Sequence, residues 1–291
     1  FRRRLGALPG DRGLSERLGS KMNNRIGLIA GSGQFPLIFS RKARQSGYEV
    51  VAAAFLKETD PALEADATVI EWMHLGQLRR LIDFFKRNAV SQAVMLGAIQ
   101  KTRIFTDVRP DAKAIAIIAG MRHTHDDALL RAFAGALEKE GISILPSTFL
   151  LPELLAPKGC WTRKKPRRPE KKDIAIGWRV AKELGRLDVG QCAVVGRGSV
   201  LALEAIDGTD ATIERGGRLG KGKAVVVKVC KPNQDLRFDV PAIGVQTIET
   251  MRRSGAQVLV VEAGKAVVFD RQEMIALADA YGISILALED G

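Results

Sequence analysis

The sequence has 291 residues, is 46% hydrophobic and 27% charged, and carries a formal net charge of +12. This composition is that of an ordinary globular protein and excludes disordered and collagen-like chains. The positive charge is concentrated in two segments: residues 1–21 carry +4 and residues 158–172 carry +7, which leaves +1 for the other 255 residues. A nucleic-acid-binding protein that is basic over its whole surface is therefore not expected.

The length favours two domains, at roughly 150 residues per domain. No apolar run approaches the ~20 residues that a membrane-spanning helix needs. The three cysteines include no C-x-x-C pair, which indicates a reducing compartment, so we expect a cytoplasmic protein. Met22 reads as a natural start, and we treat residues 1–21 as an upstream extension or disordered leader.

The first half of the chain alternates short apolar runs with longer amphipathic ones. We predict strands at 25–31, 48–55, 91–99 and 142–151, and helices at 35–46, 75–88 and 126–141. This alternation indicates βαβ units and a parallel sheet. Residues 22–151 are accordingly predicted to form a Rossmann-like N-terminal α/β domain.

The composition changes after residue 151. Residues 152–172 contain four prolines and the basic run, and they are predicted to be an exposed linker. Helices are then expected near 173–188, 247–255 and 271–282, and β-structure near 192–213, 223–232, 256–264, 265–270 and 283–288. The segments 211–214 and 216–222 read as turns. Residues 173–291 are thus predicted to be a mixed α/β domain with more antiparallel pairing.

The segment Gly31-Ser32-Gly33-Gln34 follows the first predicted strand and opens a helix. Backbone amides at this position commonly bind a phosphate or another anion. The full G-x-G-x-x-G pattern is missing, so a plain strand-to-helix turn is equally compatible with it.

The H-T-H-D-D segment at residues 123–127 could contact a metal or a ligand. Asp126 or Asp127 could equally cap the helix that follows, without any metal. Cys160, Cys192 and Cys230 lack zinc-site spacing and are predicted to be buried apolar residues.

Charged residues are densest between residues 191 and 244. Carboxylates at strand ends are oxygen ligands of the kind that Mg²⁺ or Mn²⁺ takes, and neighbouring lysines complement phosphate oxygens. Asp235, Arg237 and Asp239 alternate, so they would share one face of an extended chain. Either a metal-assisted phosphoryl site or a solvated, ion-paired edge fits this pattern.

Several strings in this sequence resemble the UDP-2,3-diacylglucosamine pyrophosphatase family of the LpxI type. They are GLIAGSGQFP, DDALLR, ELGRLDVGQ, LALEAIDGTDA and KPNQDLRFDVPAIGVQTI, and they run in order from about residue 25 to the end of the chain. The resemblance implies a magnesium-dependent hydrolase of lipid A biosynthesis in Gram-negative bacteria, which splits UDP-2,3-diacylglucosamine into UMP and 2,3-diacylglucosamine 1-phosphate (lipid X). It also implies two domains with a lipid-binding crevice between them. The enzyme would be soluble or peripheral on the inner membrane, and the resemblance leaves a homodimer open.

The family's essential aspartate corresponds to Asp239. Asp239, Asp210 and Glu204 are the expected catalytic carboxylates. We expect Asp239 to bind Mg²⁺ or Mn²⁺ or to orient the attacking water, and Asp210, or else Glu204, to supply a further oxygen ligand to the metal. The expected substrate-binding residues are Gly31, Gly33, Gln34, Gly97, Gln191, Thr209, Lys228, Lys231, Gln234 and Arg237. The alternative function is a nucleotide-sugar lipid-binding protein of the same fold that lacks catalysis.

Overall fold

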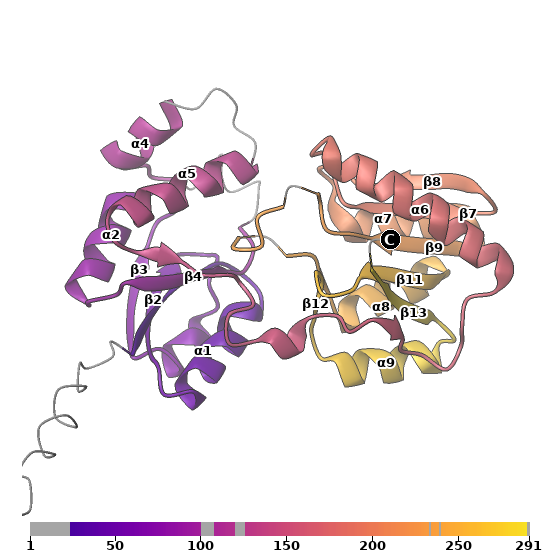
Figure 1. Ribbon diagram of the computed structural model, residues 1–291, viewed down its shortest axis with the longest axis horizontal. Helices are drawn as coiled ribbons and strands as arrows, with labels where there is room; N and C mark the ends of the chain where they lie inside the picture. Colours follow the sequence, from indigo (N-terminus) through magenta and orange to yellow (C-terminus); the bar gives the residue numbers. More distant parts are fainter. Residues whose placement is uncertain (1–23, 100–107, 120–125, 233, 239, 290–291) are drawn as a thin grey trace, which may run out of the picture. The chain divides into compact units, whose positions relative to one another are not determined.

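The computed structural model describes residues 24–99, 108–119, 126–232, 234–238 and 240–289. The chain divides into two compact units, which we describe separately. One is built on a five-stranded sheet and the other on a six-stranded sheet (Figure 1). The predicted α/β class with two parts is confirmed.

The five-stranded sheet has the order β3-β2-β1-β4-β5, the order of a Rossmann-like sheet. Its strands are β1 (Arg25–Ala30), β2 (Glu49–Phe55), β3 (Val69–Met73), β4 (Gln92–Leu96) and β5 (Ser143–Ile144). Strand β2 pairs in parallel with both β1 and β3. The strand predicted at 142–151 is reduced to β5, because Pro146 and Thr148 accept turn hydrogen bonds from Phe149 and Leu151.

Helices cover both faces of this sheet. They are α1 (Phe35–Gln45), α2 (Leu78–Arg87), α4 (Ala112–Ala119) and α5 (Asp126–Lys139), together with the short 3₁₀ helix η1 (Pro61–Ala65). Helix α2 buries Leu78, Leu81, Ile82 and Phe85, which recur at helical spacing. Helix α1 lies on one face, and α2 and α5 lie on the other (Figure 1), so the strands between them are apolar on both sides.

The six-stranded sheet has the order β6-β13-β11-β9-β7-β8. Its strands are β6 (Gly159–Cys160), β7 (Cys192–Gly196), β8 (Ser199–Leu203), β9 (Ala224–Lys228), β11 (Ala256–Glu262) and β13 (Ser284–Leu288). The three central strands β9, β11 and β13 are parallel, whereas β6, β7 and β8 pair antiparallel with their neighbours. The predicted mixed character of this half is confirmed. A separate two-stranded sheet joins β10 (Ala242–Ile243) and β12 (Val267–Val268).

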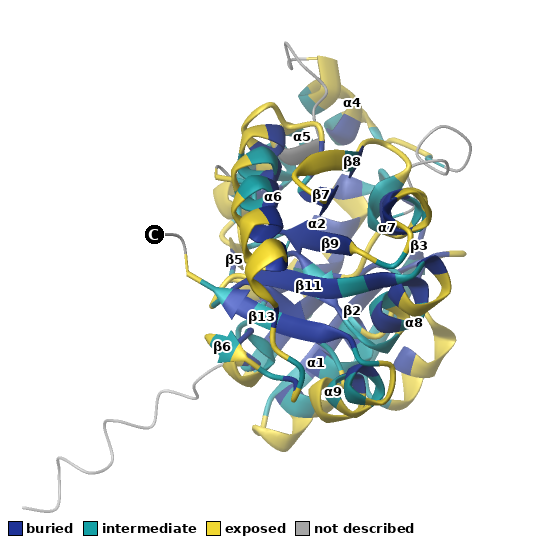
Figure 2. Cartoon of the chain, turned by 90° about the vertical axis from the view of Figure 1, so that its right-hand side faces the viewer, coloured by how far each residue is buried: buried dark blue, intermediate teal, exposed yellow. Residues whose placement is uncertain are grey.

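This sheet is also enclosed between helices. Helix α6 (Arg168–Arg186) packs on one face, where Val225 and Val227 of β9 contact Ile174 and Ala181. Helices α7 (Gly208–Gly220), α8 (Val245–Ser254) and α9 (Arg271–Ala280) cover the other face. Alternate side chains of each strand therefore enter two different cores, and Figure 2 shows β9, β11 and β13 buried between the helix layers.

Helix α7 contradicts the prediction of turns at 211–214 and 216–222. The glycines in this segment are typical of turns, but here they are the positions at which neighbouring elements pack closely against the helix. A Cβ atom on Gly216 would lie 2.5 Å from the Val194 side chain, and one on Gly217 would lie 2.8 Å from the carbonyl oxygen of Ser254. The glycines thus allow α7 to pack tightly on β7 and α8.

The segment predicted as a linker contains regular structure. It includes the 3₁₀ helix η2 (Pro152–Leu154), strand β6 paired with β13, and the first residues of α6, which begins at Arg168. Cys160 of β6 is exposed, contrary to the expectation of burial, whereas Cys192 and Cys230 are buried. All three are free thiols, as predicted.

Candidate functional site

Five predicted site residues lie at one end of the six-stranded sheet, a region we call the polar edge: Gln191, Glu204, Thr209, Asp210 and Lys228. The sheet register explains why they meet. Cys192 pairs with Lys228 across β7 and β9, and the amide of Glu204 donates to the carbonyl of Cys192 at 2.9 Å. The polar edge is therefore the carboxyl end of the parallel strands, where α/β sheets commonly bind ligands.

Glu204 is held by donors on both of its oxygens. The Thr209 hydroxyl donates to Oε1 at 2.6 Å, and the backbone amide of Gln191 donates to Oε2 at 2.9 Å. The residue is only 7% exposed. Gly190 permits this arrangement, because a Cβ there would lie 2.9 Å from the carbonyl carbon of Glu204.

Charges of both signs surround the buried thiol of Cys192. Burial raises the pKa of Cys192, the carboxylates of Glu204 and Asp210 raise it further, and the ammonium of Lys228 lowers it. Asp210 is exposed in the first turn of α7, and Lys228 donates to the carbonyl of Ala242 at 3.0 Å. The polar edge thus combines an exposed carboxylate with a buried cation.

The loop after β9 carries Lys231, Gln234 and Arg237. The Lys231 ammonium lies 2.6 Å from Asp188, and the Gln234 side chain accepts from the Lys231 amide at 2.9 Å. Arg237 forms a bidentate pair with Asp235, at 3.0 and 2.8 Å. The hydrogen bonds from Arg237 hold the pKa of Asp235 below its usual value.

The expectation that Asp235 and Arg237 share one face of an extended chain is wrong. Residues 236–238 form a turn, in which the amide of Phe238 donates to the carbonyl of Asp235 at 3.0 Å. A turn brings residues that are two apart into direct contact. The arginine and the first aspartate are therefore partners of each other.

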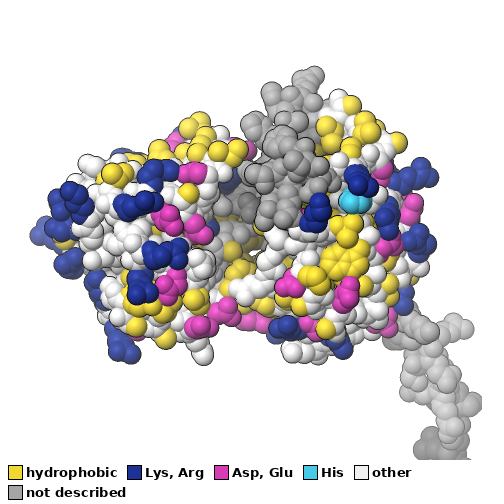
Figure 3. Space-filling view, turned by 180° about the vertical axis from the view of Figure 1, so that it is seen from behind, with side chains coloured by type: hydrophobic (Ala, Val, Ile, Leu, Met, Phe, Trp, Pro, Cys, Tyr) yellow, Lys and Arg dark blue, Asp and Glu magenta, His cyan; other side chains and the backbone are white. Residues whose placement is uncertain are grey.

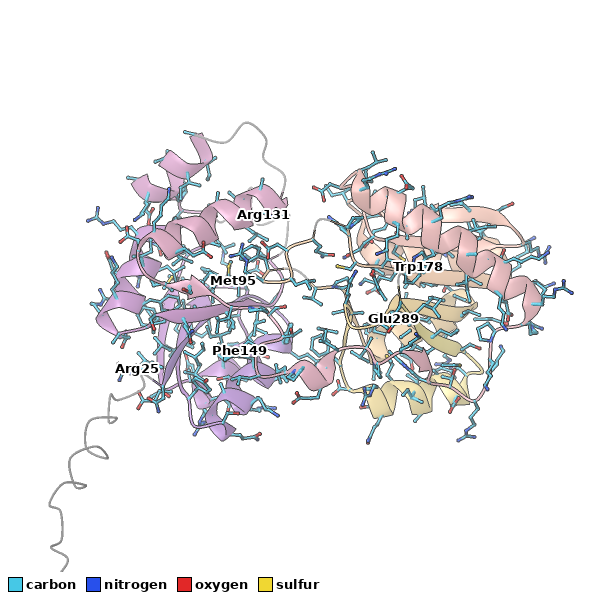
Figure 4. The ribbon with its side chains drawn as sticks, in the orientation of Figure 1. Arg25, Met95, Arg131, Phe149, Trp178 and Glu289 are labelled. Carbon is cyan, nitrogen blue, oxygen red and sulfur yellow. The ribbon has the colours of Figure 1, made fainter. Side chains whose placement is uncertain are left out.

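Glu262 and Lys182 anchor the start of this loop, a role that no sequence motif indicates. Glu262, 1% exposed, accepts from the Cys230 amide at 2.9 Å and from Lys182 at 2.8 Å. Lys182 also donates to the Cys230 carbonyl at 3.4 Å and lies 5.6 Å from the ring centre of Trp178, a residue of α6 that Figure 4 labels. Asp188, by contrast, could have been noticed, because it lies in the ELGRLDVGQ string.

The predicted glycine loop lies at the end of β1 in the other unit. The backbones of Ser32 and Ala98 bond to each other at 2.8 and 3.1 Å, so the Ser32 amide already has a partner. A Cβ on Gly31 would lie 2.6 Å from the Ala98 carbonyl oxygen, and one on Gly97 would lie 2.5 Å from that of Ser32. These two glycines are needed for the close contact between loops. Gly33 has a φ of +89°, with open space where a Cβ would point, and Gln34 precedes α1.

Some predicted residues cannot be placed. Asp239, His123 and His125 lie outside the described residues, as do the side chains of Asp126 and Asp127. Among the residues that the structure describes, no three His, Cys, Asp or Glu side chains gather into a metal-binding group. The oxygen donors of Asp210 and Glu204 still match Mg²⁺ or Mn²⁺ in kind, and Asp210 is exposed for such a contact.

Comparisons with known proteins cover nearly the whole chain. Residues 25–154 match the family described as the LpxI N-terminal domain, and residues 157–286 match the LpxI C-terminal domain. The chain is 32% identical over 280 residues to the UDP-2,3-diacylglucosamine pyrophosphatase LpxI of Caulobacter vibrioides, which covers 91% of this chain and 98% of that protein.

Solved structures give only distant similarity. The biotin carboxylase subunit of pyruvate carboxylase is 16% identical, with 69% of this chain and 42% of that chain covered and a TM-score of 0.26. The precorrin-6A reductase CobK is 13% identical, with 92% and 88% covered and a TM-score of 0.29. These scores are too low to support any argument about the site.

Proposed function

Because this chain belongs to the LpxI family, we propose that it hydrolyses the pyrophosphate bond of UDP-2,3-diacylglucosamine in lipid A biosynthesis. The products are UMP and 2,3-diacylglucosamine 1-phosphate. The observation that carries the proposal is the match of both halves of the chain to the family, together with 32% identity to a named pyrophosphatase.

The polar edge and the segment that follows β9 supply groups that this reaction needs. Water attacks one phosphorus of the diphosphate, the bridging P–O bond breaks, and the departing phosphate takes up the negative charge. In our proposal Lys228, Lys231 and Arg237 neutralise this charge as it develops. Asp239 orients the attacking water and accepts its proton, while Glu204 fixes Thr209 and the Gln191 backbone beside the diphosphate.

A divalent cation belongs to the same proposal. Asp239 and Asp210 would hold Mg²⁺ or Mn²⁺, which when bound draws electron density from the phosphoryl oxygens. The exposed carboxylate of Asp210 suits such a ligand, because these cations prefer oxygen donors and keep several waters.

The substrate's acyl chains call for apolar surface near the chemistry. Two loops next to the polar edge expose large apolar side chains: Leu187 is 72% exposed, Val189 50% and Ile206 86%. Isolated exposed apolar residues are common, but three in adjoining loops indicate a contact with something apolar. Among the described residues, no helix has the length and apolar character that crossing a membrane requires. We propose a cytoplasmic enzyme with peripheral contact to the inner membrane; the lipid-binding crevice between the two domains stays a prediction.

One assay separates catalysis from simple binding. The purified chain is given UDP-2,3-diacylglucosamine in detergent micelles, and the release of UMP and of the lipid phosphate is followed. We expect both products in equal amounts, and at least ~100-fold less turnover for Asp239→Ala with substrate affinity retained. Binding without release of UMP would instead support the non-catalytic lipid-binding alternative. Near-normal turnover in the variant would remove Asp239 from the chemistry.

A further inference from the structure

The start of α6 carries a group of exposed basic side chains that the proposed reaction does not use. We call this group the basic surface and define it as Lys165, Arg168, Lys171, Lys172 and Arg197, all of which are exposed. None of the five forms an ion pair with any residue that the structure describes. In Figure 1, α6 begins on the right-hand side of the six-stranded unit. Figure 3 views the protein from behind, so the same side is on the left, and Lys and Arg side chains gather there.

The acidic residues of this segment face inward and are already bonded. Glu170 is 6% exposed and accepts from the backbone and the guanidinium of Arg167, and Asp173 is 4% exposed. Asp173 accepts from the amides of Arg197 and Gly198 at 3.0 and 2.7 Å, which holds the β7–β8 turn against α6. Asp173 thus holds the backbone of Arg197 against α6, which carries three of the other basic residues. The side chains of all five basic residues remain exposed to solvent.

These cations do not help the helix that carries them. The amino end of a helix has a partial positive charge, so lysine and arginine are unfavourable in its first turn. Arg168 and Lys171 lie in this region, and Lys172 directly follows it. Helix stability therefore does not explain the cluster, whereas contact with an external anion does.

The basic surface lies too far from the polar edge to take part in the reaction. Arg197 follows the last residue of β7, whereas Cys192, at the opposite end of this strand, pairs with Lys228. Five residues of strand span roughly 17 Å. The cations of the basic surface therefore do not neutralise a diphosphate bound at the polar edge and are available to another partner.

We propose that the basic surface docks the protein on a bilayer rich in anionic phospholipid. This inference rests on the proposed function, because a diacylated substrate is carried by a membrane and an enzyme bound to that membrane meets it more often. Charge complementarity supports this partner, since clustered lysines and arginines are attracted to anionic headgroups. Outside residues 1–21 and 158–172 the net charge is only +1, and this balance does not favour a nucleic acid as the partner.

The test uses the full chain and vesicles without substrate. Phosphatidylcholine vesicles are compared with vesicles of equal parts phosphatidylcholine and phosphatidylglycerol in a sedimentation assay at low and high salt. We expect binding to the anionic vesicles only, and its loss at high salt. The quadruple variant Lys165→Gln, Arg168→Gln, Lys171→Gln, Lys172→Gln should bind more weakly by on the order of 600-fold, because each of the four charges contributes roughly five-fold.

A control variant carries four Gln substitutions of exposed basic residues elsewhere: Arg79, Lys139, Arg252 and Arg271. It should bind like the wild-type chain. The quadruple variant should also keep its melting temperature, since it removes charges that oppose the helix dipole.

Three results would overturn the inference: equal binding to neutral vesicles, equal losses in both variants, or tighter binding to duplex DNA than to anionic vesicles at the same salt. Activity in detergent micelles, measured in parallel, should be the same for wild type and both variants. Absence of UMP release with intact vesicle binding would refute the proposed function alone, and normal release without vesicle binding would refute docking alone.

Discussion

Lys228 is a buried cation whose surroundings suit the binding of a diphosphate. It is 9% exposed, and among the residues that the structure describes its ammonium donates to one backbone carbonyl, that of Ala242. A buried charge is costly unless opposite charges compensate it. Glu204 and Asp210 supply such charges nearby, since all three act electrostatically on Cys192. An anionic substrate would add the partner that this position favours.

We therefore predict that Lys228→Met lowers turnover by at least ~100-fold, because the charge that develops on the departing phosphate loses a fixed cation. Lys223→Met is the matched control: this lysine precedes the same strand, β9, but lies exposed at its opposite end. Steady-state kinetics and thermal melts of both variants provide the measurement. Wild-type turnover in Lys228→Met would exclude its ammonium from the reaction.

At the scale of elements, helix α7 depends on the absence of side chains. Gly216→Ala would bring a Cβ to 2.5 Å from the Val194 side chain in the core. We expect such overpacking to reduce the free energy of unfolding by about 1–3 kcal/mol. Gly135→Ala in α5 is the control, because nothing lies within 4 Å of the new Cβ, and it should add about 0.5–1 kcal/mol through helix propensity. Urea titrations measure both, and an equal effect in the two variants would contradict the packing argument.

A second element-scale prediction concerns pH and the carboxylate of Glu140, at the end of α5. Hydrogen bonds from Lys113 of α4 and Lys86 of α2 lower the pKa of Glu140 to about 2. A pKa below the unfolded value of 4.5 means that the charged form stabilises the fold above about pH 4.5, and that this contribution is lost as the pH falls towards 2. Glu140→Gln should thus melt at a lower temperature than wild type at pH 7, by a small amount because this carboxylate is partly exposed to solvent. The two melting temperatures should converge in acid, and a difference independent of pH would refute the ion-pair explanation.

The elements also show what the sequence could and could not predict. Strands β1, β2 and β9 and helix α2 follow from hydrophobic periodicity alone, since their burial depends on local pattern. Helix α7 does not, because its glycines have low helix propensity and the compensating contacts with Val194 and Ser254 come from distant parts of the chain. The Glu262–Lys182 pair could not be predicted for the same reason, because its two residues are 80 positions apart and meet only in the folded chain.

At the scale of the whole molecule, the six-stranded sheet separates two kinds of charge. The polar edge, at the carboxyl ends of its parallel strands, combines two carboxylates with the buried cation of Lys228, and the basic surface lies at the other end of β7. The net charge of +12 therefore combines separate features. The basic run is visible in the sequence. Its distance from the candidate site follows only from the structure, where the two lie at opposite ends of β7.

Metal dependence is a property of the folded site, because the two aspartates proposed as ligands, Asp210 of α7 and Asp239, lie far apart in the sequence. Treatment with EDTA should abolish UMP release, and Mg²⁺ or Mn²⁺ should restore it. Direct binding of Mn²⁺, followed by electron paramagnetic resonance, gives a readout that does not depend on turnover. It should weaken in Asp210→Asn but not in Glu273→Gln, whose carboxylate likewise lies in the first turn of a helix, α9. Full activity after removal of divalent ions would show that Asp210 and Asp239 act without a metal, and that the cations Lys228, Lys231 and Arg237 neutralise the diphosphate on their own.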